Sequence, residues 1–244
     1  MGLLAPVPGE TVLELAAGPG DTGFIAAERL GSKGLLLSTD VAPEMVGAAR
    51  RRAAALGVEN VEFRVEDASA ISLPDAAVDG VLCRFGVMLV PDPSRALAEI
   101  ARVLRPGGRA ALAVWASSDA NDWMTAAGRS AVALGFSERP DPAAPGPFRL
   151  ADPDELRRLF TDAGLQVGTL ADVPILWRAA SLDDWWQHIR DLSRMLSTLL
   201  ERLTPEEGQA VREGAGERLA RYVAEDGSLE VPGLARVVLA VRDA

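Results

Sequence analysis

Three glycines and a set of acidic residues are the parts of this sequence whose types and spacing could bind a ligand. Gly18, Gly20 and Gly23 follow the apolar run Val12–Leu15, which contains the acid Glu14. Glycine accepts backbone angles that a side chain forbids, and it lets a ligand lie against the main chain. A helix that starts after the turn would add unpaired N–H groups and a partial positive charge. The spacing therefore predicts a buried strand, a glycine turn and a helix start.

The turn leaves more than one kind of ligand open. Its glycines complete the G-x-G-x-x-G pattern of dinucleotide sites, whereas the Gly-Lys-Ser/Thr end of a P-loop is missing, since Asp21 and Thr22 follow Gly20. Glu14 and Asp21 place negative charge where a pyrophosphate would approach. Such an acidic turn favours a ligand that carries an ammonium or sulfonium group. The remaining alternative is a strand–turn–helix corner that binds nothing.

Charged residues also follow the next apolar runs. Asp40, the pair Glu66-Asp67 and Arg84 each come directly after a run with the composition of a buried strand. The carboxyl ends of parallel strands meet at one edge of a sheet, and open α/β sheets bind ligands there, near the switch in strand order. We therefore expect these side chains to share one rim with the glycine turn.

The only histidine, His188, is the candidate general base. It falls on an expected helix, Ser181–Leu203, one turn from Trp185 and within reach of Asp184. That position is compatible with the wall of a cavity beside the apolar stripe of the helix. The alternative is a histidine at the solvent edge, paired with an acid.

Composition restricts the class of protein. The chain has 244 residues, 48% of them apolar, and a net charge of −10 from 35 acids and 25 bases. An acidic protein repels nucleic acid and anionic lipid at long range, so we expect neither as a partner. No apolar run is long enough for a membrane span, and residues 1–10 lack the pattern of a signal peptide. One cysteine, Cys83, permits no internal disulfide or thiolate metal cluster. We expect a cytoplasmic protein, and the oligomeric state, a homodimer included, stays open.

Strand and helix patterns alternate through the first half of the chain. The expected strands are 11–16, 35–39, 61–65, 78–83 and 109–115, and the expected helices are 22–30, 43–56 and 93–104. This repeat predicts a largely parallel sheet that is covered on both faces by right-handed crossovers. After Trp115 the pattern changes. A loop-rich region is followed by expected helices at 124–134, 151–163, 181–203 and 205–223 and strands at 166–175 and 234–241.

Four segments, in chain order, resemble the motifs of class I S-adenosylmethionine-dependent methyltransferases. They are Glu14–Gly20 (with Ala16 in place of the first motif glycine), Asp40–Met45, Glu66–Asp75 followed by Val78-Asp79, and Val103–Gly108 leading into 110–115. The resemblance is closest to the ubiquinone/menaquinone-biosynthesis-like branch, also called methyltransferase type 11. It covers residues 8 to about 115 closely and the later core strands loosely.

The resemblance implies an α/β, Rossmann-like sheet of seven strands in the order 3-2-1-4-5-7-6, with the last strand antiparallel, and a helical lid. The cofactor-binding core would comprise residues 1–116, 151–178 and 227–244. Residues 117–150 and 179–226 would form helical insertions that cover the substrate cavity. Relatives carry several tens of residues before the first strand. Here ten precede it, and we expect either a shortened chain or closure of the site from elsewhere.

The resemblance also implies S-adenosylmethionine as the cofactor, with S-adenosylhomocysteine as the product. Its methionine part would lie on Ala16, Ala17, Gly18 and Gly20, with Glu14 ordering the turn or meeting the ammonium group. The Arg84 carbonyl would also face the ammonium.

At the adenosine end, Asp40 would accept hydrogen bonds from both ribose hydroxyls, as a carboxylate can. Val41 and Met45 would pack on the adenine, Asp67 would accept from its amino group, and Ala68 would support the ring. Glu66 and Phe85 complete the expected cofactor site.

The implied activity is methyl transfer to a small, hydrophobic or aromatic acceptor at O, N or C. The sulfonium already makes the methyl group electrophilic, so the protein mainly orients the reactants, which can supply roughly 7–11 kcal/mol. A general base such as His188 is optional. The expected acceptor pocket consists of Met88, Trp115, Trp123 and Trp185.

Two other functions stay open at this stage. The sequence also argues against arsenite as the acceptor and against a metal site. The chain could bind the cofactor without catalysis, or it could be a nicotinamide-dependent oxidoreductase, although Tyr222 is the only tyrosine and forms no Tyr-x-x-x-Lys pair. Arsenite methylation needs several thiols. Acids do not cluster after the fourth and fifth strands, so we predict no metal site.

Overall fold

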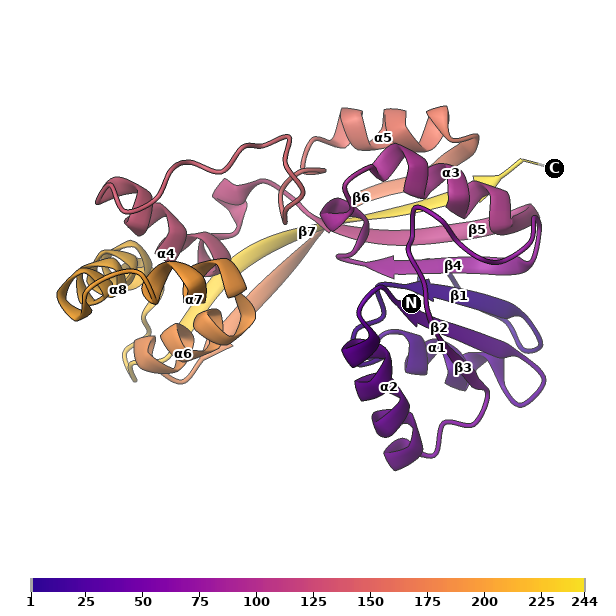
Figure 1. Ribbon diagram of the computed structural model, residues 1–244, viewed down its shortest axis with the longest axis horizontal. Helices are drawn as coiled ribbons and strands as arrows, with labels where there is room; N and C mark the ends of the chain where they lie inside the picture. Colours follow the sequence, from indigo (N-terminus) through magenta and orange to yellow (C-terminus); the bar gives the residue numbers. More distant parts are fainter. Residues whose placement is uncertain (1, 244) are drawn as a thin grey trace. The chain divides into compact units, whose positions relative to one another are not determined.

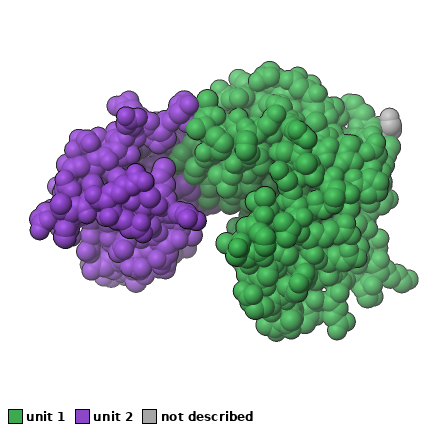
Figure 2. Space-filling view, viewed as in Figure 1, with its two compact units in different colours: residues 1–115, 143–172, 236–244 green, residues 116–142, 173–235 purple. Residues whose placement is uncertain are grey.

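A computed structural model describes residues 2–243, and these form two compact units (Figure 2). Unit 1 consists of residues 1–115, 143–172 and 236–244, and unit 2 of residues 116–142 and 173–235. Residues 143–150 therefore fold with the sheet and not with the helical unit. The outer halves of the last two strands, 173–179 and 229–235, fold with unit 2, because both strands continue well past the rest of the sheet.

The sheet has the strand order β3-β2-β1-β4-β5-β7-β6, which confirms the predicted topology. Its strands are β1 (Thr11–Leu15), β2 (Leu35–Asp40), β3 (Val61–Val65), β4 (Val78–Arg84), β5 (Leu104–Trp115), β6 (Leu165–Ala179) and β7 (Leu229–Arg242). The pairings among β1 to β5 are parallel, and β7 runs in the opposite direction (Figure 1). Strands β1 and β4 lie in the middle of the sheet, so most of their side chains are buried, and apolar residues predominate among them.

Helices cover both faces of the sheet in unit 1. Helices α1 (Gly23–Leu30) and α2 (Pro43–Leu56) share one core with alternate residues of β1, β2 and β4. Helices α3 (Pro93–Val103) and α5 (Pro153–Asp162) share the core of the other face. Three of the four begin with a proline, whose missing N–H has no partner to lose in the first turn. This arrangement fixes the carboxyl ends of β1 to β5 at one rim.

Unit 2 is built from α4 (Asp122–Ala133), α6 (Leu182–Leu192), α7 (Arg194–Leu200) and α8 (Pro205–Leu219). Short 3-10 turns, η2 (Ser118–Ala120) and η3 (Ala220–Tyr222), flank α4 and α8. Gly214 lets α8 approach α4 closely, because a Cβ at that position would lie 2.3 Å from the Ser130 hydroxyl. Among the described residues, no helix is long and apolar enough to cross a membrane.

Strands β5, β6 and β7 are longer than predicted, and three helical segments differ from the prediction in ways that the structure explains. The continuous helix expected over residues 181–203 is interrupted at Ser193, whose hydroxyl accepts a hydrogen bond from the Leu196 N–H at 3.2 Å and so starts α7. Serine favours such caps because its side chain competes with the helix backbone. The helix expected to end at Leu104 ends one residue earlier, since Leu104 already pairs with Val78 in the sheet. Helix α8 ends at Leu219 and continues only as the turn η3.

Arg109 on β5 attaches the start of the chain to unit 1. Its guanidinium donates to the Leu4 and Ala5 carbonyl oxygens and forms a two-pronged ion pair with Glu10 at 2.8 Å. Both charged side chains are largely buried. The hydrogen bonds and charge of Arg109 hold the pKa of the Glu10 carboxyl below its usual value.

We expect Arg109→Gln to lower the free energy of unfolding by about 2 kcal/mol, because it leaves a mostly buried carboxylate without its cation. Urea unfolding at neutral pH measures this change. Arg64→Gln is the matched control, since Arg64 also pairs with a glutamate but both side chains are exposed, and it should change stability by less than about 0.5 kcal/mol. Equal effects of the two substitutions would contradict this account.

Candidate ligand site at the carboxyl rim of unit 1

The glycine turn after β1 is held in a strained shape by backbone hydrogen bonds. Ala16 has a φ of +50° and Gly20 a φ of +89°, both in the left-handed region that side chains disfavour. The Ala17 N–H donates to the Thr39 carbonyl at 2.9 Å, and the Thr39 hydroxyl donates to the Glu14 carbonyl at 2.7 Å. The turn is thereby tied to the end of β2.

Glu14 places a buried carboxyl group under the turn. The residue is 2% exposed, and its Oε2 atom has no hydrogen-bond partner among the described residues. A Cβ on Gly23 would lie 1.9 Å from that oxygen, so the third glycine of the pattern is needed to make room for the acid. Burial raises the pKa of Glu14 to about 7, while the Gly23 N–H and the charge of Arg84 act in the opposite direction.

Ser38 adds a second polar group without a partner beside Glu14. The two residues are register partners in the parallel pairing of β1 and β2, so their side chains lie on the same face. The Ser38 hydroxyl is buried and also makes no hydrogen bond to the described residues. Buried polar groups are rarely left in this way. An unpaired carboxyl oxygen under the turn fits a site that receives a hydrogen-bond donor with positive charge.

Asp40, at the end of β2, presents a carboxylate at the rim. One oxygen accepts from the Gly18 N–H at 2.9 Å and the other from the Ala42 N–H at 3.0 Å. An ionised carboxylate has about four acceptor positions, so two remain for hydroxyl donors of a ligand. The next residue, Val41, is 68% exposed, and Met45 is 45% exposed one turn along α2. An apolar surface therefore adjoins the acceptor atoms.

The charge of Asp21 is compensated, contrary to the expectation of an acidic turn. Asp21 forms an ion pair with Arg52 on α2, and Arg84 lies 3.4 Å from its other oxygen. Arg52 also donates to the Pro19 carbonyl at 3.3 Å and lies over the Phe24 ring. Because Arg52 and Arg84 neutralise Asp21, the acidic character of the turn comes from Glu14. Both arginines lie far from Asp21 in the sequence.

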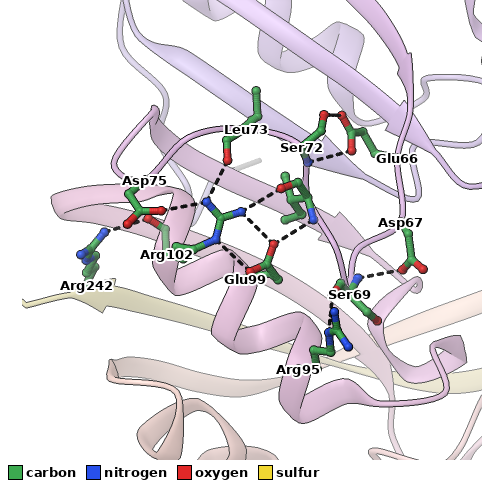
Figure 3. A network of polar contacts seen from close by, with 11 residues as sticks. Glu66, Asp67, Ser69, Ser72, Leu73, Asp75, Arg95, Glu99, Arg102 and Arg242 are labelled. Atoms are coloured by element: carbon green, nitrogen blue, oxygen red, sulfur yellow. Dashed lines mark hydrogen bonds and ion pairs between the residues drawn. The ribbon is translucent and has the colours of Figure 1, made fainter.

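The loop after β3 is organised by its own first residues (Figure 3). Glu66 is buried, and its carboxylate accepts from the Ser72 N–H at 3.0 Å and from the Ser72 hydroxyl. Asp67 is exposed, and one of its oxygens accepts from the Ser69 N–H at 2.8 Å. Glu66 therefore shapes the loop, while Asp67 and the half-buried Ala68 remain at the rim, where the sequence predicts contacts with an adenine.

Helix α3 fastens the same loop, which sequence reasoning missed. The Arg102 guanidinium donates to the Ile71 and Leu73 carbonyl oxygens and pairs with Asp75 and Glu99. Figure 3 shows its contacts with Leu73, Asp75 and Glu99. Both carboxylates raise the pKa of Arg102, so it remains a cation. Farther along α3, the Arg95 side chain donates to the Ser69 carbonyl at 2.7 Å. The i, i+3 spacing of Glu99 and Arg102 is the only feature of the sequence that points to this contact. The same spacing is equally typical of an ion pair on the surface of a helix.

The end of β4 carries an aromatic pair. Phe85 has a φ of +63° and stacks on Trp115 at the end of β5, with ring centroids 4.0 Å apart and planes 5° apart. Both residues are half-buried, and the Arg84 guanidinium lies over the Phe85 ring. Met88, expected in the acceptor pocket, is instead 2% exposed and belongs to the core shared with α3. Trp115 and Phe85 therefore offer the aromatic surface at this rim.

The other predicted functional residues belong to unit 2. Trp185 is 1% exposed and donates its indole N–H to the Trp123 carbonyl, and Trp123 stacks on Trp177. Both predicted pocket tryptophans thus pack inside this unit and present little surface to a ligand. His188 is half-exposed, with its Nδ1 atom 3.3 Å from Asp184, which matches the alternative of a solvent-edge histidine. Residues 2–243 contain no cluster of three or more ligating side chains that could hold a metal ion.

Comparisons with known proteins find similarity to methyltransferases over part of this chain. A family model described as a methyltransferase domain matches residues 12–108. Two curated relatives are similar to part of the chain. An arsenite methyltransferase of Halobacterium salinarum is 41% identical over 108 residues, 44% of this chain and 28% of the relative. A demethylmenaquinone methyltransferase of Thermus thermophilus is 43% identical over 99 residues, 40% and 44% of the two chains.

A solved structure, a SAM-dependent methyltransferase of Aquifex aeolicus, superposes with a TM-score of 0.54 at 27% identity and covers 70% of this chain and 79% of its own. The chain spans less than half the length of the two curated relatives it matches. The matched region contains the glycine turn, the ends of β2 to β4 and the loop that Arg102 fastens.

We expect Glu14→Gln to remove a pH dependence of stability. The carboxyl holds its proton up to about pH 7 in the fold but only to about pH 4.5 in the unfolded chain. Between these values the unfolded state releases a proton that the folded state keeps, so folding becomes less favourable as pH rises. Relative to Glu14→Gln, the native sequence should lose about 3 kcal/mol of unfolding free energy between pH 4.5 and pH 8.

Urea unfolding at several pH values measures this difference. Glu62→Gln is the matched control, because Glu62 is exposed on β3, and its stability curve should run parallel to that of the native sequence. Parallel curves for Glu14→Gln as well would show that the carboxyl is not buried as described.

We expect Arg102→Lys to loosen the loop after β3, because an ammonium group cannot reach two carbonyls and two carboxylates at once. Hydrogen exchange of the Ile71 and Ser72 amides, which bond to Glu99 and Glu66, should speed up about tenfold, equivalent to about 1.4 kcal/mol of local opening. Arg158→Lys, at an exposed ion pair on α5, should leave these two amides unchanged. Unaltered exchange in Arg102→Lys would contradict the fastening role.

Proposed function

Since residues 12–108 form a methyltransferase domain of the class I S-adenosylmethionine-dependent family, we propose that this chain methylates a small acceptor. The observation that carries the proposal is the rim of unit 1. A buried carboxyl with a free oxygen, a carboxylate with spare acceptor positions and an exposed apolar surface occur there in order along β1, β2 and α2. These are the complements of an ammonium group, a ribose and an adenine.

The residues present fit S-adenosylmethionine. Glu14 and the main chain of Ala16–Gly18 would hold the amino-acid part, since the unpaired Oε2 atom of Glu14 lacks a cationic partner. Asp40 would accept from the ribose hydroxyls. Val41 and Met45 would cover the adenine, and the Asp67 carboxylate would accept from its amino group. The carboxyl groups of Glu14, Asp40 and Asp67 each keep acceptor capacity that the described residues leave free.

When bound, the cofactor supplies a methyl group made electrophilic by a sulfonium. The chain itself has to orient the acceptor and keep water away, which can account for roughly 7–11 kcal/mol of the barrier. The bonded turn and the fastened loop after β3 provide rigid supports for this task. The His188 side chain is exposed to solvent and pairs with Asp184, so we propose a transfer in which orientation matters more than a general base.

The acceptor is proposed to be hydrophobic or aromatic, with a quinone-like ring as one example. The stacked Phe85 and Trp115 offer a flat apolar surface at the ends of β4 and β5. The Thermus relative is named for a quinone precursor. The Halobacterium relative is named for arsenite, but Cys83 is the only cysteine here, it is buried, and burial raises the pKa of its thiol to about 11. A thiolate for arsenic is therefore missing from this chain.

The nicotinamide alternative loses its main support. It rested on the third glycine of G-x-G-x-x-G, and Gly23 is explained by the space that Glu14 requires. A buried carboxyl under the turn also opposes a pyrophosphate. A chain that binds the cofactor without catalysis remains the alternative to be tested.

Calorimetry tests cofactor binding. We expect the chain to bind S-adenosylhomocysteine but not NAD, and Val41→Asp to weaken the former at least tenfold, or about 1.4 kcal/mol, because a charge replaces an apolar contact with the adenine. Val41 is exposed, so the variant should fold. Asp162→Asn, at an exposed position on α5, is the control. Equal affinities for Val41→Asp and the native sequence would contradict the proposed site.

Transfer of a radiolabelled methyl group from S-adenosylmethionine to a metabolite extract tests catalysis. We expect label in a small, organic-extractable product, and much less of it with Val41→Asp at a cofactor concentration that does not saturate the variant. Binding of S-adenosylhomocysteine without any transferred label would favour the non-catalytic alternative.

A further inference from the structure

We propose that Gly86, after β4, positions the glycine turn of the cofactor site by leaving the space that the Ala16 methyl group occupies. The inference rests on the proposed function, and it names a positioning residue outside the turn itself. It predicts that residues 16 and 86 act as a coupled pair whose combined size sets where the turn lies.

Ala16 stands where the family motif has its first glycine, and it keeps the backbone shape of a glycine. Its φ of +50° lies in the left-handed region, which costs a residue with a Cβ energy that glycine does not incur. The neighbouring Ala17 and Gly18 amides bond to the end of β2. The direction of the Ala16 methyl group is therefore fixed by the main chain, and it cannot turn away from a neighbour.

The neighbour in that direction is Gly86. A Cβ on Gly86 would lie 2.3 Å from the Ala16 Cβ and 2.9 Å from the Cys83 sulfur. Both distances are shorter than real contacts of a Cβ atom. Gly86 has a φ of −99°, which any residue can adopt. Its lack of a side chain is thus required by space and not by backbone conformation.

Neither side of this contact can yield easily. Cys83 is buried, and its sulfur accepts from the Gly86 and Val87 N–H groups, which holds the turn after β4. The Ala16 methyl group has no rotamer to change. A side chain at position 86 would therefore displace the main chain of residues 16–18, where the amino-acid part of the cofactor is proposed to lie. The adenosine contacts at Val41 and Met45 lie on other elements and should be affected much less.

Affinities for S-adenosylhomocysteine and for adenosine, measured by calorimetry, separate these two effects. For Gly86→Ala we expect affinity for S-adenosylhomocysteine to fall at least tenfold and affinity for adenosine to change less than threefold. Adding Ala16→Gly should bring S-adenosylhomocysteine affinity back to within threefold of the native value. The Cys83 contact is present in both backgrounds, so it cancels in the double-mutant cycle.

Gly80→Ala is the matched control. Gly80 is buried on β4, the strand that precedes Gly86, and a Cβ there would lie 3.3 Å from Leu4. It should reduce stability without changing the ratio of the two affinities, and Ala16→Gly should not rescue it. Should Gly86→Ala fail to fold, the Ala16→Gly single and the double variant give the comparison, and both should fold and bind S-adenosylhomocysteine within threefold of each other.

The outcomes distinguish the two proposals. A native chain that does not bind S-adenosylhomocysteine would overturn the proposed function and this inference with it. A native chain that binds, combined with additive effects of the two substitutions or with equal losses for both ligands in Gly86→Ala, would overturn the inference alone. A double variant that binds S-adenosylhomocysteine no better than Gly86→Ala would also overturn it, because removal of the Ala16 methyl group takes away the shorter of the two contacts.

Discussion

The burial of the Glu14 carboxyl under the glycine turn is the constraint on which the site depends. A charged carboxylate is costly to bury without a partner, and here burial raises its pKa to about 7. The protein accommodates the group with a glycine at position 23 and with a serine hydroxyl beside it. This arrangement leaves a hydrogen-bond acceptor without a partner near the end of β1. A positively charged donor could bind to it.

The turn above this carboxyl is positioned from three directions, and each uses a different kind of contact. Strand β2 supplies hydrogen bonds from Thr39 and Asp40, and α2 supplies the Arg52 ion pair. Strand β4 supplies packing between Gly86 and Ala16. Because backbone bonds and close packing are both sensitive to displacements of less than 1 Å, the shape of the turn is determined by the spacing of the central strands.

The sequence predicts the sheet and the rim well because both depend on local patterns. Apolar runs followed by Gly18, Asp40, Asp67 and Arg84 give the strand ends directly, and repetition of the βα unit predicts a largely parallel sheet. The strand order itself follows from the family resemblance. Contacts between distant segments leave no such pattern. The pairing of Asp21 with Arg52 and Arg84, the grip of Arg102 on the loop after β3 and the fit of Gly86 against Ala16 each join residues more than 25 positions apart. Trp123, Trp185 and Met88 are predicted to line the acceptor pocket but are buried in a core. The sequence cannot separate these two positions, because large apolar residues are common in both.

The two carboxyl groups of the rim, those of Asp40 and Glu14, differ in their surroundings. This difference favours one orientation of a bound ligand. Asp40 is partly exposed and bound by two N–H groups, so its remaining acceptor positions suit neutral hydroxyl donors. Glu14 is buried, and one of its oxygens has no hydrogen-bond partner. It therefore suits a positively charged donor, because the attraction between opposite charges is least screened in the protein interior. A ligand with hydroxyls at one end and an ammonium at the other can satisfy both groups in only one orientation. The apolar surface of Val41 and Met45, which adjoins Asp40 and not Glu14, fixes the same orientation independently.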